Sequence, residues 1–526
     1  MAEPYYITTA IAYPNGKPHI GHAYEAIAAD VIARFQRQQG RDVRFQTGTD
    51  EHGLKMAQKA RELGVTPKML SDEMTQYFIE MCDILQISYD VFQRTTAPGH
   101  HAASQELWRR MAANGDLYLD RYEGWYSVRD EAYYEAGELV EGEGGRKLSP
   151  QGTAVEWTVE ESWFFRLSRY QEPLLALFRE NPEFLQPESR RNEVLRFIEG
   201  GLRDLSVSRT SFDWGVKVPV TEGCSDNHVM YVWVDALTNY LTGLGFPEPT
   251  GEMAKWWPAD LHLIGKDIVR FHAVYWPAFL MSAGLPLPKC VFGHGFLLHR
   301  GEKMSKSLGN VVDPLELVAR FGVDSLRYFL MRDVSFGADG SYSAEAIVTR
   351  CNAELANSFG NLAQRVLSQF FRNLDGRLAV EGELTDGDLG LKDALKKAVV
   401  GSVPGDMAAL NFSVAIETWM SHVFACNQYV DEQAPWALKK QGEVARMETV
   451  LAVLFQCIRD LAIAIRPVIP GSADRLLDQM GIPPGERDQA ALVDTGWYTR
   501  HCATGFRLSQ PMGVFPRLEL PAMIEH

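Results

Sequence analysis

Residues 5–22 read YYITTAIAYPNGKPHIGH, and this stretch decides the fold. Its aromatic and β-branched start predicts a β-strand over 5–11, and Pro14-Asn15-Gly16 predicts the turn that follows. Apolar residues then recur at helical spacing from Ile20 to Phe35, and Gly40 stands where such a helix should stop. The stretch therefore predicts a strand, a loop and a helix, the opening of a parallel α/β unit.

A second predicted strand, over 43–47, follows the helix and runs into Gly48-Thr49-Asp50. The same pattern resumes later, with predicted strands over 231–234 and 261–265. In a parallel sheet of this kind, the active groups lie at the carboxyl ends of the strands. After about residue 345, the strand patterns give way to long helical ones. We therefore predict an α/β fold class, with a Rossmann-like nucleotide-binding sheet followed by an all-α helical bundle.

Residues from about 115 to 210 interrupt the α/β pattern. They are rich in Tyr and Trp, and residues 119–161 contain eleven acidic side chains against four basic ones. We interpret this segment as an insertion that splits the sheet domain. The predicted segments are the first half of the sheet domain (1–114), the insertion (115–210), the second half of the sheet domain (211–292), a linker that carries a lysine motif (293–345) and the helical domain (346–526).

The composition is that of a folded protein with several domains. The 526 residues are 46% hydrophobic and 11% aromatic, and 52 basic against 68 acidic side chains give a net charge of −16. That charge at first disfavours a nucleic-acid partner, because such proteins usually carry a basic surface. The acidity is concentrated outside residues 346–526, so we expect any nucleic-acid contact to depend on local patches.

Cellular location and metal content are also constrained by the sequence. No basic segment followed by an apolar one opens the chain, and no apolar run approaches the ~20 residues that span a bilayer. The seven cysteines are scattered and form no C-x-x-C pair, so neither a disulfide framework nor a structural zinc site is indicated. We expect a cytoplasmic protein with no membrane association and no bound metal ion of its own.

The segment His19-Ile20-Gly21-His22 places two imidazoles on the first turn of the predicted helix. A helix N-terminus offers free N–H groups and partial positive charge, which favour a phosphate. Gly21 leaves room for a flat ring or a phosphate to approach the backbone. Taken alone, the two histidines could instead be surface or helix-capping residues.

The segment Lys303-Met304-Ser305-Lys306-Ser307 is the sharper motif. Two lysines three residues apart, with hydroxyl groups nearby, form a cation site suited to the charge that develops on a phosphoryl group in transfer. A solvated basic loop is the alternative. The presence of both motifs in one chain favours phosphate chemistry.

Together the two motifs make the chain resemble the class I aminoacyl-tRNA synthetases. Further segments make it similar to the methionyl-tRNA synthetase family in particular, and the resemblance covers nearly the whole chain. Besides the two motifs, the segments that carry it are residues 10–30, 47–53, 231–236, 264–268, 271–272, 361–365 and 429–436.

The resemblance implies an activity and its partners. Members of the family join L-methionine to ATP as methionyl-adenylate, release pyrophosphate and transfer methionine to the 3′ end of tRNA(Met), with Mg²⁺ expected on the nucleotide. Positioning and charge dominate such reactions, because the protein forms no covalent bond to the substrates. The resemblance assigns the catalytic contacts to His19, His22, Lys303 and Lys306.

Binding residues also follow from the resemblance. The ATP-binding set is His19, Gly21, His22, Gly265, Asp267, Lys303, Ser305 and Lys306. The methionine-binding set is Ile11, Tyr13, Asp50, Trp233, Ala236, Tyr240, Phe271 and His272, in which Asp50 meets the α-ammonium group. The set that reads the CAU anticodon is Asn361, Arg365 and Trp436.

The residue types suit these roles. Aromatic walls give the thioether of methionine soft contacts of about 0.3–1.5 kcal/mol each. An exposed Trp436 beside the turn at Pro435 could stack on an unpaired base, and Asn361 and Arg365, four residues apart, share a helix face. For each aromatic taken alone, ordinary core packing is the alternative, and for Asn361 and Arg365 it is a solvated polar face.

Two departures from the family narrow the expectation. Many relatives carry zinc-binding C-x-x-C knuckles in the insertion, whereas residues 115–210 contain no cysteine, so we expect a metal-free insertion. The sequence also lacks the additional C-terminal module with which some relatives dimerise, so we expect a monomer.

Three other functions remain open at this point. A class I synthetase for another amino acid, a small-molecule nucleotidyltransferase with a similar histidine loop, or a non-catalytic tRNA-binding protein could share parts of the pattern. The short insertion disfavours the first, the long helical region disfavours the second, and the intact lysine motif disfavours the third.

Overall fold

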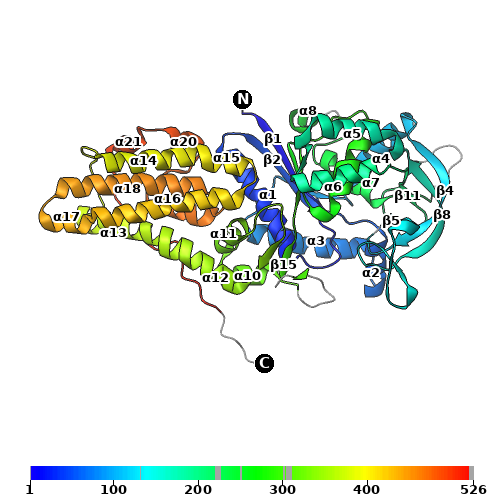
Figure 1. Cartoon of the computed structure of the whole chain (residues 1–526), viewed down its shortest axis with the longest axis horizontal. Coiled ribbons are helices and arrows are strands. Elements are labelled where there is room, and N and C mark those ends of the chain that lie inside the picture. The colour runs from blue at the N-terminus through cyan, green and yellow to red at the C-terminus, as the bar shows by residue number, and fades with distance from the viewer. Residues whose placement is uncertain are drawn as a thin grey trace, which may run out of the picture.

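The computed structural model describes residues 2–130, 132–219, 227–248, 251–299, 302–303 and 311–520. In Figure 1 a helical bundle forms one end of an elongated molecule, and a sheet with an attached insertion forms the other. The predicted fold class is confirmed. Within the described residues, no helix is both long and apolar enough to cross a membrane.

A six-stranded sheet of parallel pairs forms the centre of the molecule. Its strand order is β3-β2-β1-β13-β14-β9. The strands are β1 (Pro4–Thr9), β2 (Asp42–Thr49), β3 (Val91–Arg94), β9 (Leu185–Gln186), β13 (Leu261–Gly265) and β14 (Val291–His294). The chain builds outward from β1 in one direction through β2 and β3, and returns on the other side of β1 with β13 and β14. Ligands of such sheets bind at this switch point, beyond the carboxyl ends of β1 and β13.

Helices pack on the sheet between its strands. The chain forms α1 (Ile20–Gln38) between β1 and β2, and α2 (Leu54–Leu63) and α3 (Pro67–Ile84) between β2 and β3. The predicted helix is confirmed, and Gly40, in the left-handed region at φ 84°, lies just beyond its end. Beyond β3 follows α4 (Pro98–Ala113), and around β13 lie α7 (Val232–Thr242), α8 (Gly251–Trp256) and α9 (Trp276–Ser282).

The prediction of a strand over 231–234 is wrong. A two-residue strand, β12 (Val229–Met230), pairs with β11 (Ser208–Arg209), and the chain then enters α7. The alternation of Val and Trp imitates strand periodicity, but nearly every side chain from Val232 to Leu241 is buried, so periodicity could not separate helix from strand.

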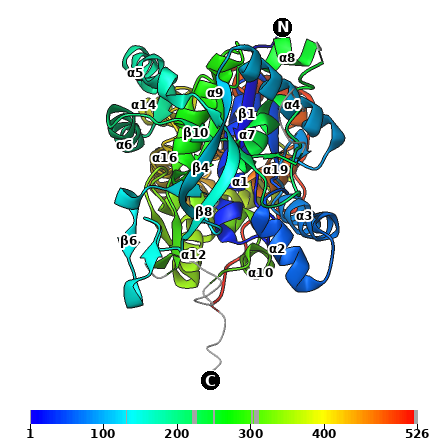
Figure 2. The ribbon, with the colours of Figure 1, turned by 90° about the vertical axis from the view of Figure 1, so that its right-hand side faces the viewer.

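The insertion is built on a long antiparallel pair of strands, seen face-on in Figure 2. Its sheet has the order β10-β8-β4-β5. The strands are β4 (Leu117–Ser127), β5 (Ala132–Tyr134), β8 (Glu156–Phe165) and β10 (Leu205–Ser206), with a small pair β6 (Val140–Glu141) and β7 (Lys147–Leu148), and helices α5 (Gln171–Glu180) and α6 (Glu188–Glu199) follow β8. One strand of the predicted insertion, β9, pairs with β14 and so extends the central sheet.

The remainder of the chain is mainly helical. A small sheet of β15 (Leu297–His299), β16 (Glu302–Lys303) and β17 (Gly340–Tyr342) adjoins α10 (Pro314–Phe321), α11 (Val323–Asp333) and α12 (Ala344–Cys351). The bundle contains α13 (Asn361–Leu374), α14 (Asp386–Lys397), α15 (Val403–Ala408), α16 (Phe412–Gln433), α17 (Pro435–Gln441), α18 (Val444–Ile465), α19 (Pro470–Gln479), α20 (Gln489–Val493) and α21 (Trp497–Ala503).

Two apolar cores hold these parts together. One core is continuous from β1, β2 and α1 through α11 into the bundle, so the sheet and the bundle share buried surface. The other joins α4, α7 and α9 to the insertion. Apolar burial is the main stabilising contribution in such assemblies. The boundaries of the five predicted segments stay predictions, and each core contains residues from at least three of the segments.

Candidate active site and anticodon-binding surface

The loop after β1 is fixed between two neighbouring strands at the switch point. The backbone N–H of Ala10 donates to Leu263 O at 3.1 Å, and that of Ala12 donates to Gly48 O at 2.9 Å. Asp50 in turn donates its N–H to Ala12 O at 2.8 Å. Only glycine fits at position 48, because a Cβ there would lie 1.9 Å from Gln93 O. These bonds place the predicted Ile11, Tyr13 and Asp50 on one rigid rim.

His19 and His22 together cap the N-terminus of α1. The ring of His19 accepts a hydrogen bond from the N–H of Gly21 at 3.0 Å, and His22 Nδ1 accepts from the N–H of His19 at 3.1 Å. Their ring centroids are 3.9 Å apart. A Cβ on Gly21 would lie 2.8 Å from Cε1 of His19, so glycine is needed for this arrangement. The capping role and a phosphate-facing role are compatible, since both place the rings at the positive end of the helix.

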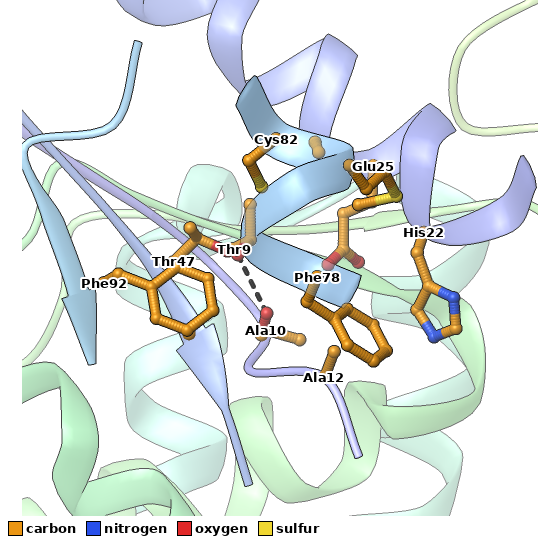
Figure 3. A pocket seen from close by; sticks show the side chains of 12 residues that line it. Thr9, Ala10, Ala12, His22, Glu25, Thr47, Phe78, Cys82 and Phe92 are labelled. Atoms are coloured by element: carbon orange, nitrogen blue, oxygen red, sulfur yellow. Dashed lines mark hydrogen bonds between the residues drawn. The ribbon is translucent and has the colours of Figure 1, made fainter. Parts of the chain in front are cut away.

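Figure 3 shows a small cavity beside His22, between α1, α3 and the ends of β1 and β2. His22 packs edge-on against Phe78 of α3, with ring centroids 5.1 Å apart. Glu25, one helical turn beyond His22, points into the same cavity. The sequence analysis missed Glu25, although its spacing of three residues from His22 puts both on one helix face.

Glu25 is paired with His294, which ends β14. The distance from Glu25 Oε2 to His294 Nε2 is 2.9 Å. Burial raises the pKa of Glu25, an effect that His294 only partly offsets. Burial lowers the pKa of His294, but the bond to Glu25 outweighs it and raises that pKa above its usual value. The hydrogen bond between Glu25 and His294 therefore joins α1 to the end of β14 across the switch point.

The predicted ribose contact lies directly after β13. Gly265 ends the strand, and Lys266–Ile268 form a short 3₁₀ turn that carries Asp267. Lys266 Nζ bonds to both carboxylate oxygens of Asp339 at 2.7 Å. Asp267 lines a cleft of about 610 Å³ between the sheet domain and the insertion. Leu205 and Phe271 line the same cleft, which therefore reaches from Asp267 to one ring of the aromatic pair.

The predicted methionine residues Trp233 and Phe271 stack face to face, with centroids 3.9 Å apart and planes inclined by 5°. Trp233 also meets His272 edge-on at 5.9 Å. Trp233 is in α7, and Phe271 and His272 are in the π-helical turn Phe271–Tyr275 that leads into α9, so neither stacked aromatic is in a strand. The structure therefore brings together residues from two elements, and their common role in methionine binding stays a prediction.

Tyr240 and His272 are joined by a directed hydrogen-bond chain. His272 Nδ1 lies 3.0 Å from Ile268 O and must donate to this carbonyl, which leaves Nε2 as the acceptor for the Tyr240 hydroxyl at 2.7 Å. Burial lowers the pKa of His272 to about 4 and raises that of Tyr240 well above its usual value. Both groups are therefore neutral at pH 7.

The two halves of the predicted methionine site are connected by residues that the sequence analysis missed. His52, two residues after Asp50, contacts Asp235 of α7 with 2.6 Å between Nδ1 and Oδ2. His100 of α4 contacts the other oxygen of Asp235, also at 2.6 Å. Burial raises the pKa of Asp235, but the two imidazoles outweigh it and hold the carboxylate ionised. No spacing in the sequence signals this cluster, because its members come from three distant segments.

The remaining predicted methionine residues lie around this centre. Tyr13 accepts a hydrogen bond from the N–H of Met56 at 3.0 Å, and Ala236 is buried on α7 beside Asp235. Ile11 is half-buried in the loop after β1. The lysine motif is different: Ser305 and Lys306 lie outside the described residues, and of Lys303 only the backbone is described, paired with Leu298.

The predicted anticodon residues form a separate surface at the far end of the molecule. Arg365 of α13 lies over the indole of Trp436, 5.4 Å from the ring centroid, and bonds to Asp431 at 2.6 Å. Arg365 and Trp436 line a pocket of about 290 Å³. Trp436 is 38% exposed at the start of α17, directly after Pro435 as predicted. Asn361 is exposed at the first residue of α13, one turn from Arg365.

Known proteins match this chain along nearly its whole length. The family model described as "tRNA synthetases class I (M)" matches residues 5–367. The methionine–tRNA ligase of Rhizobium meliloti (strain 1021) is 54% identical over 519 residues, which are 98% of this chain and 99% of the relative. That of Mycobacterium bovis is 54% identical over 523 residues, 99% of each chain.

Solved structures agree with the sequence matches. Mycobacterium tuberculosis methionyl-tRNA synthetase in complex with methionyl-adenylate superimposes with a TM-score of 0.93 at 53% identity, covering 98% of this chain and 100% of that one. The free-state structure of the same enzyme gives 0.87 at 49% identity, covering 99% of both chains. The chain therefore belongs to the methionine–tRNA ligases of the class I tRNA synthetases.

Proposed function

We propose that this chain activates L-methionine with ATP at the switch point of its sheet and transfers the methionyl group to tRNA(Met), whose CAU anticodon it reads with the helical bundle. The observation that supports this most strongly is the joint site beyond β1 and β13, where His22 of the histidine-capped helix lines a small cavity and Phe271 of the stacked aromatic pair lines a larger cleft. In the first step, a carboxylate oxygen of methionine attacks the α-phosphorus of ATP and pyrophosphate leaves. In the second, the terminal ribose 2′-hydroxyl of the tRNA attacks the carbonyl of the adenylate and AMP leaves.

Methionine would bind between the rim after β1 and α7. Asp50 would accept from its α-ammonium group, which suits a carboxylate at the end of a strand. Ile11, Tyr13, Trp233, Ala236, Tyr240, Phe271 and His272 would surround the side chain. The neutral state of His272 supports this role, because a charged imidazole would oppose an apolar thioether.

ATP would bind along the N-terminus of α1. His19, Gly21 and His22 would contact its phosphates, and Gly265 and Asp267 its ribose. Lys303, Ser305 and Lys306 would neutralise the departing pyrophosphate. The described residues contain no group of three or more His, Cys, Asp or Glu side chains that could hold a metal ion. We therefore propose that Mg²⁺ enters on the phosphates of ATP, the usual way in which this ion is held at nucleotide sites.

The anticodon surface is proposed at Asn361, Arg365 and Trp436. The exposed face of the indole can stack on an unpaired base. The guanidinium of Arg365 can donate hydrogen bonds to the edge of a base. We further propose that the insertion holds no structural zinc, because residues 115–210 contain no cysteine. We also propose that the protein is a cytoplasmic monomer. The five predicted segments stand as proposed domains.

Methionine-dependent exchange of pyrophosphate into ATP tests the first step, and charging of tRNA with CAU or altered anticodons tests the second.

Loss of one charge-stabilising donor costs about 10²–10³ in rate, so Lys306→Ala should slow exchange by that factor with little change in methionine affinity. Trp436→Ala should leave exchange intact and reduce charging about 5- to 150-fold, the effect of ~1–3 kcal/mol of stacking. Exchange with another amino acid, or equal damage to both assays by Trp436→Ala, would contradict these assignments.

A further inference from the structure

A basic patch lies on the hairpin of α2 and α3, at the rim of the proposed methionine site. It covers α2 and the start of α3, residues 54–69, and its tip, residues 61–69, is nearly all exposed. The rest of α3 is acidic, with Asp72, Glu73, Glu80 and Asp83. Between residues 54 and 69, four basic side chains stand against the single acid Glu62. The basic residues are Lys55, Lys59, Arg61 and Lys68. In a chain with a net charge of −16, this reversal of sign is local and pronounced.

The hairpin is anchored to the active site at its base. Met56, Ala60 and Leu70 form a small buried core with Tyr13 and Trp214 packed against it. The indole N–H of Trp214 donates to Glu51 O at 2.7 Å, one residue after Asp50. Tyr13 bonds to the first turn of α2 through the N–H of Met56. The hairpin therefore projects from the edge of the proposed methionine pocket and is held there rigidly.

The tip combines charge with exposed apolar side chains. Leu63 and Met69 are 54% and 59% exposed, and Val65 is close to them in the turn. Lys59 pairs with Glu62, and Lys68 with Asp72, but both are exposed pairs of little strength that an incoming anion can replace. Arg61, in the last turn of α2, is exposed, and no ion pair or side-chain hydrogen bond to it is found in the part of the chain that the structure describes. Such a surface fits a polyanion that also offers sugar and base faces.

We infer that the α2–α3 hairpin binds the acceptor arm of the tRNA substrate and guides its 3′ end to the adenylate. The inference rests on the proposed function, which requires a tRNA end to arrive beside Tyr13 and Asp50. A ten-residue helix such as α2 is about 15 Å long, and stacked nucleotides rise about 3.4 Å each. The tip therefore meets phosphates about four nucleotides from the 3′ end.

The position of the hairpin in the fold agrees with this path. In both Figure 1 and Figure 2, α2 lies on the same lower side of the molecule as α10 and α12, which lead toward the bundle. Helices α4 and α5 lie on the opposite, upper side. One nucleic acid laid along the lower side can therefore reach the anticodon surface at one end and the hairpin at the other.

The test compares two double variants. Lys59→Gln with Arg61→Gln removes two cations from the hairpin, and Arg109→Gln with Arg179→Gln removes two similarly exposed cations from α4 and α5. Each lost phosphate contact lowers the dependence of log affinity on log salt concentration by about 0.7–0.9. We expect the Lys59/Arg61 variant to have a kcat/KM for tRNA about tenfold lower than the wild type. The slope of its log affinity for tRNA against log salt concentration should be smaller by about 1.4–1.8, and its pyrophosphate exchange should be unchanged. The control variant should match the wild type in kcat/KM, salt slope and exchange.

Two further measurements identify the bound part of the RNA. An RNA stem-loop of the acceptor arm, ending in the unpaired 3′ nucleotides, should bind the Lys59/Arg61 protein variant less tightly than it binds the wild type. An RNA stem-loop of the anticodon arm should bind the two proteins equally. Leu63→Ser should lower charging without changing the salt slope. Unchanged salt slope and acceptor-arm binding in the Lys59/Arg61 variant would overturn the inference and leave an acidic protein as the partner of this surface. Failure of the wild type to charge any tRNA would instead overturn the proposed function.

Discussion

The indole of Trp233 and the phenyl ring of Phe271 lie almost parallel, 3.9 Å apart, although they belong to α7 and to the turn after β13. The same turn carries His272, which meets the edge of Trp233 and binds the hydroxyl of Tyr240. One packed unit therefore connects the second half of the sheet to the proposed methionine pocket. Its rings support one another, so the shape of the pocket depends on the whole unit.

Removal of Trp233 should weaken methionine binding selectively. Trp233→Ala deletes a sulfur contact and an aromatic pair, together about 1–2 kcal/mol, so we expect the KM for methionine to rise about 5- to 30-fold. The KM for ATP should change less than twofold. Pyrophosphate exchange at varied methionine and ATP measures both constants. Trp157→Ala, at a tryptophan that is 54% exposed on the insertion, is the matched control and should have no effect. An equal rise in both constants would mean that Trp233 supports the fold and not the pocket.

The first strand, the capped helix and the order of the α/β elements could be predicted, because turn residues and periodicity are local signals. The helix that begins at Val232 could not be predicted, because the buried start of a helix and a buried strand have the same apolar pattern. The contact of His52 and His100 with Asp235 was also beyond prediction, because it joins three segments that only the folded sheet brings together. Glu25 was within reach, three residues from His22 on the same helix face.

The protonation of His272 should make stability depend on pH. Its pKa is about 4 in the folded protein, against 6.5 for the free imidazole, so the unfolded chain binds more protons between these values. The contribution of neutral His272 to the free energy of unfolding is therefore fully present above about pH 6.5, and it is lost as the pH falls toward 4. At pH 5 the loss from this group is about 2 kcal/mol. The unfolding midpoint of the wild type at pH 7 and pH 5, compared with that of His272→Asn, isolates this contribution.

His272→Asn removes the titrating group and keeps a side chain that can donate and accept hydrogen bonds. Its midpoint at pH 7 should be lower than that of the wild type, but its fall from pH 7 to pH 5 should be smaller. His422→Asn is the comparison variant: burial also lowers the pKa of His422, but less than that of His272, so this variant should change the pH dependence less. If His272→Asn shows the same pH dependence as the wild type, His272 does not titrate with the lowered pKa.

Gly21→Ala should damage adenylate formation more than methionine binding. The new Cβ would lie 2.8 Å from the ring of His19, so the ring must turn away and lose its bond to the helix N-terminus. We expect exchange to slow about 10²-fold, as for loss of one charge-stabilising donor, with the KM for methionine changed less than twofold. Gly99→Ala is the control, because a Cβ there meets nothing within 4 Å. A rate near that of the wild type would exclude His19 from the reaction.

The connection between sheet and bundle depends on a fully buried ion pair. Arg327 of α11 holds Asp30 of α1 at 2.6 Å and donates to the backbone oxygens of Pro467 and Val468, which follow α18. Burial raises the pKa of Asp30, but Arg327 and Arg34 outweigh it and hold the carboxylate ionised. The pair thus joins the helix that carries His19 and His22 to the end of a helix that begins near the anticodon surface.

Asp30→Asn leaves the guanidinium of Arg327 buried without a charged partner in its place. Breaking such a pair by removing one member costs about 3–5 kcal/mol, whereas neutralising an exposed partner costs about 0–1 kcal/mol. We expect a corresponding drop in unfolding free energy for Asp30→Asn and almost none for Asp375→Asn, whose partner Arg507 is exposed. Arg327→Met combined with Asp30→Asn should be more stable than the sum of the single changes, because it removes the orphaned charge. An additive double variant would show that the two residues act independently and that the apolar core alone joins the sheet to the bundle.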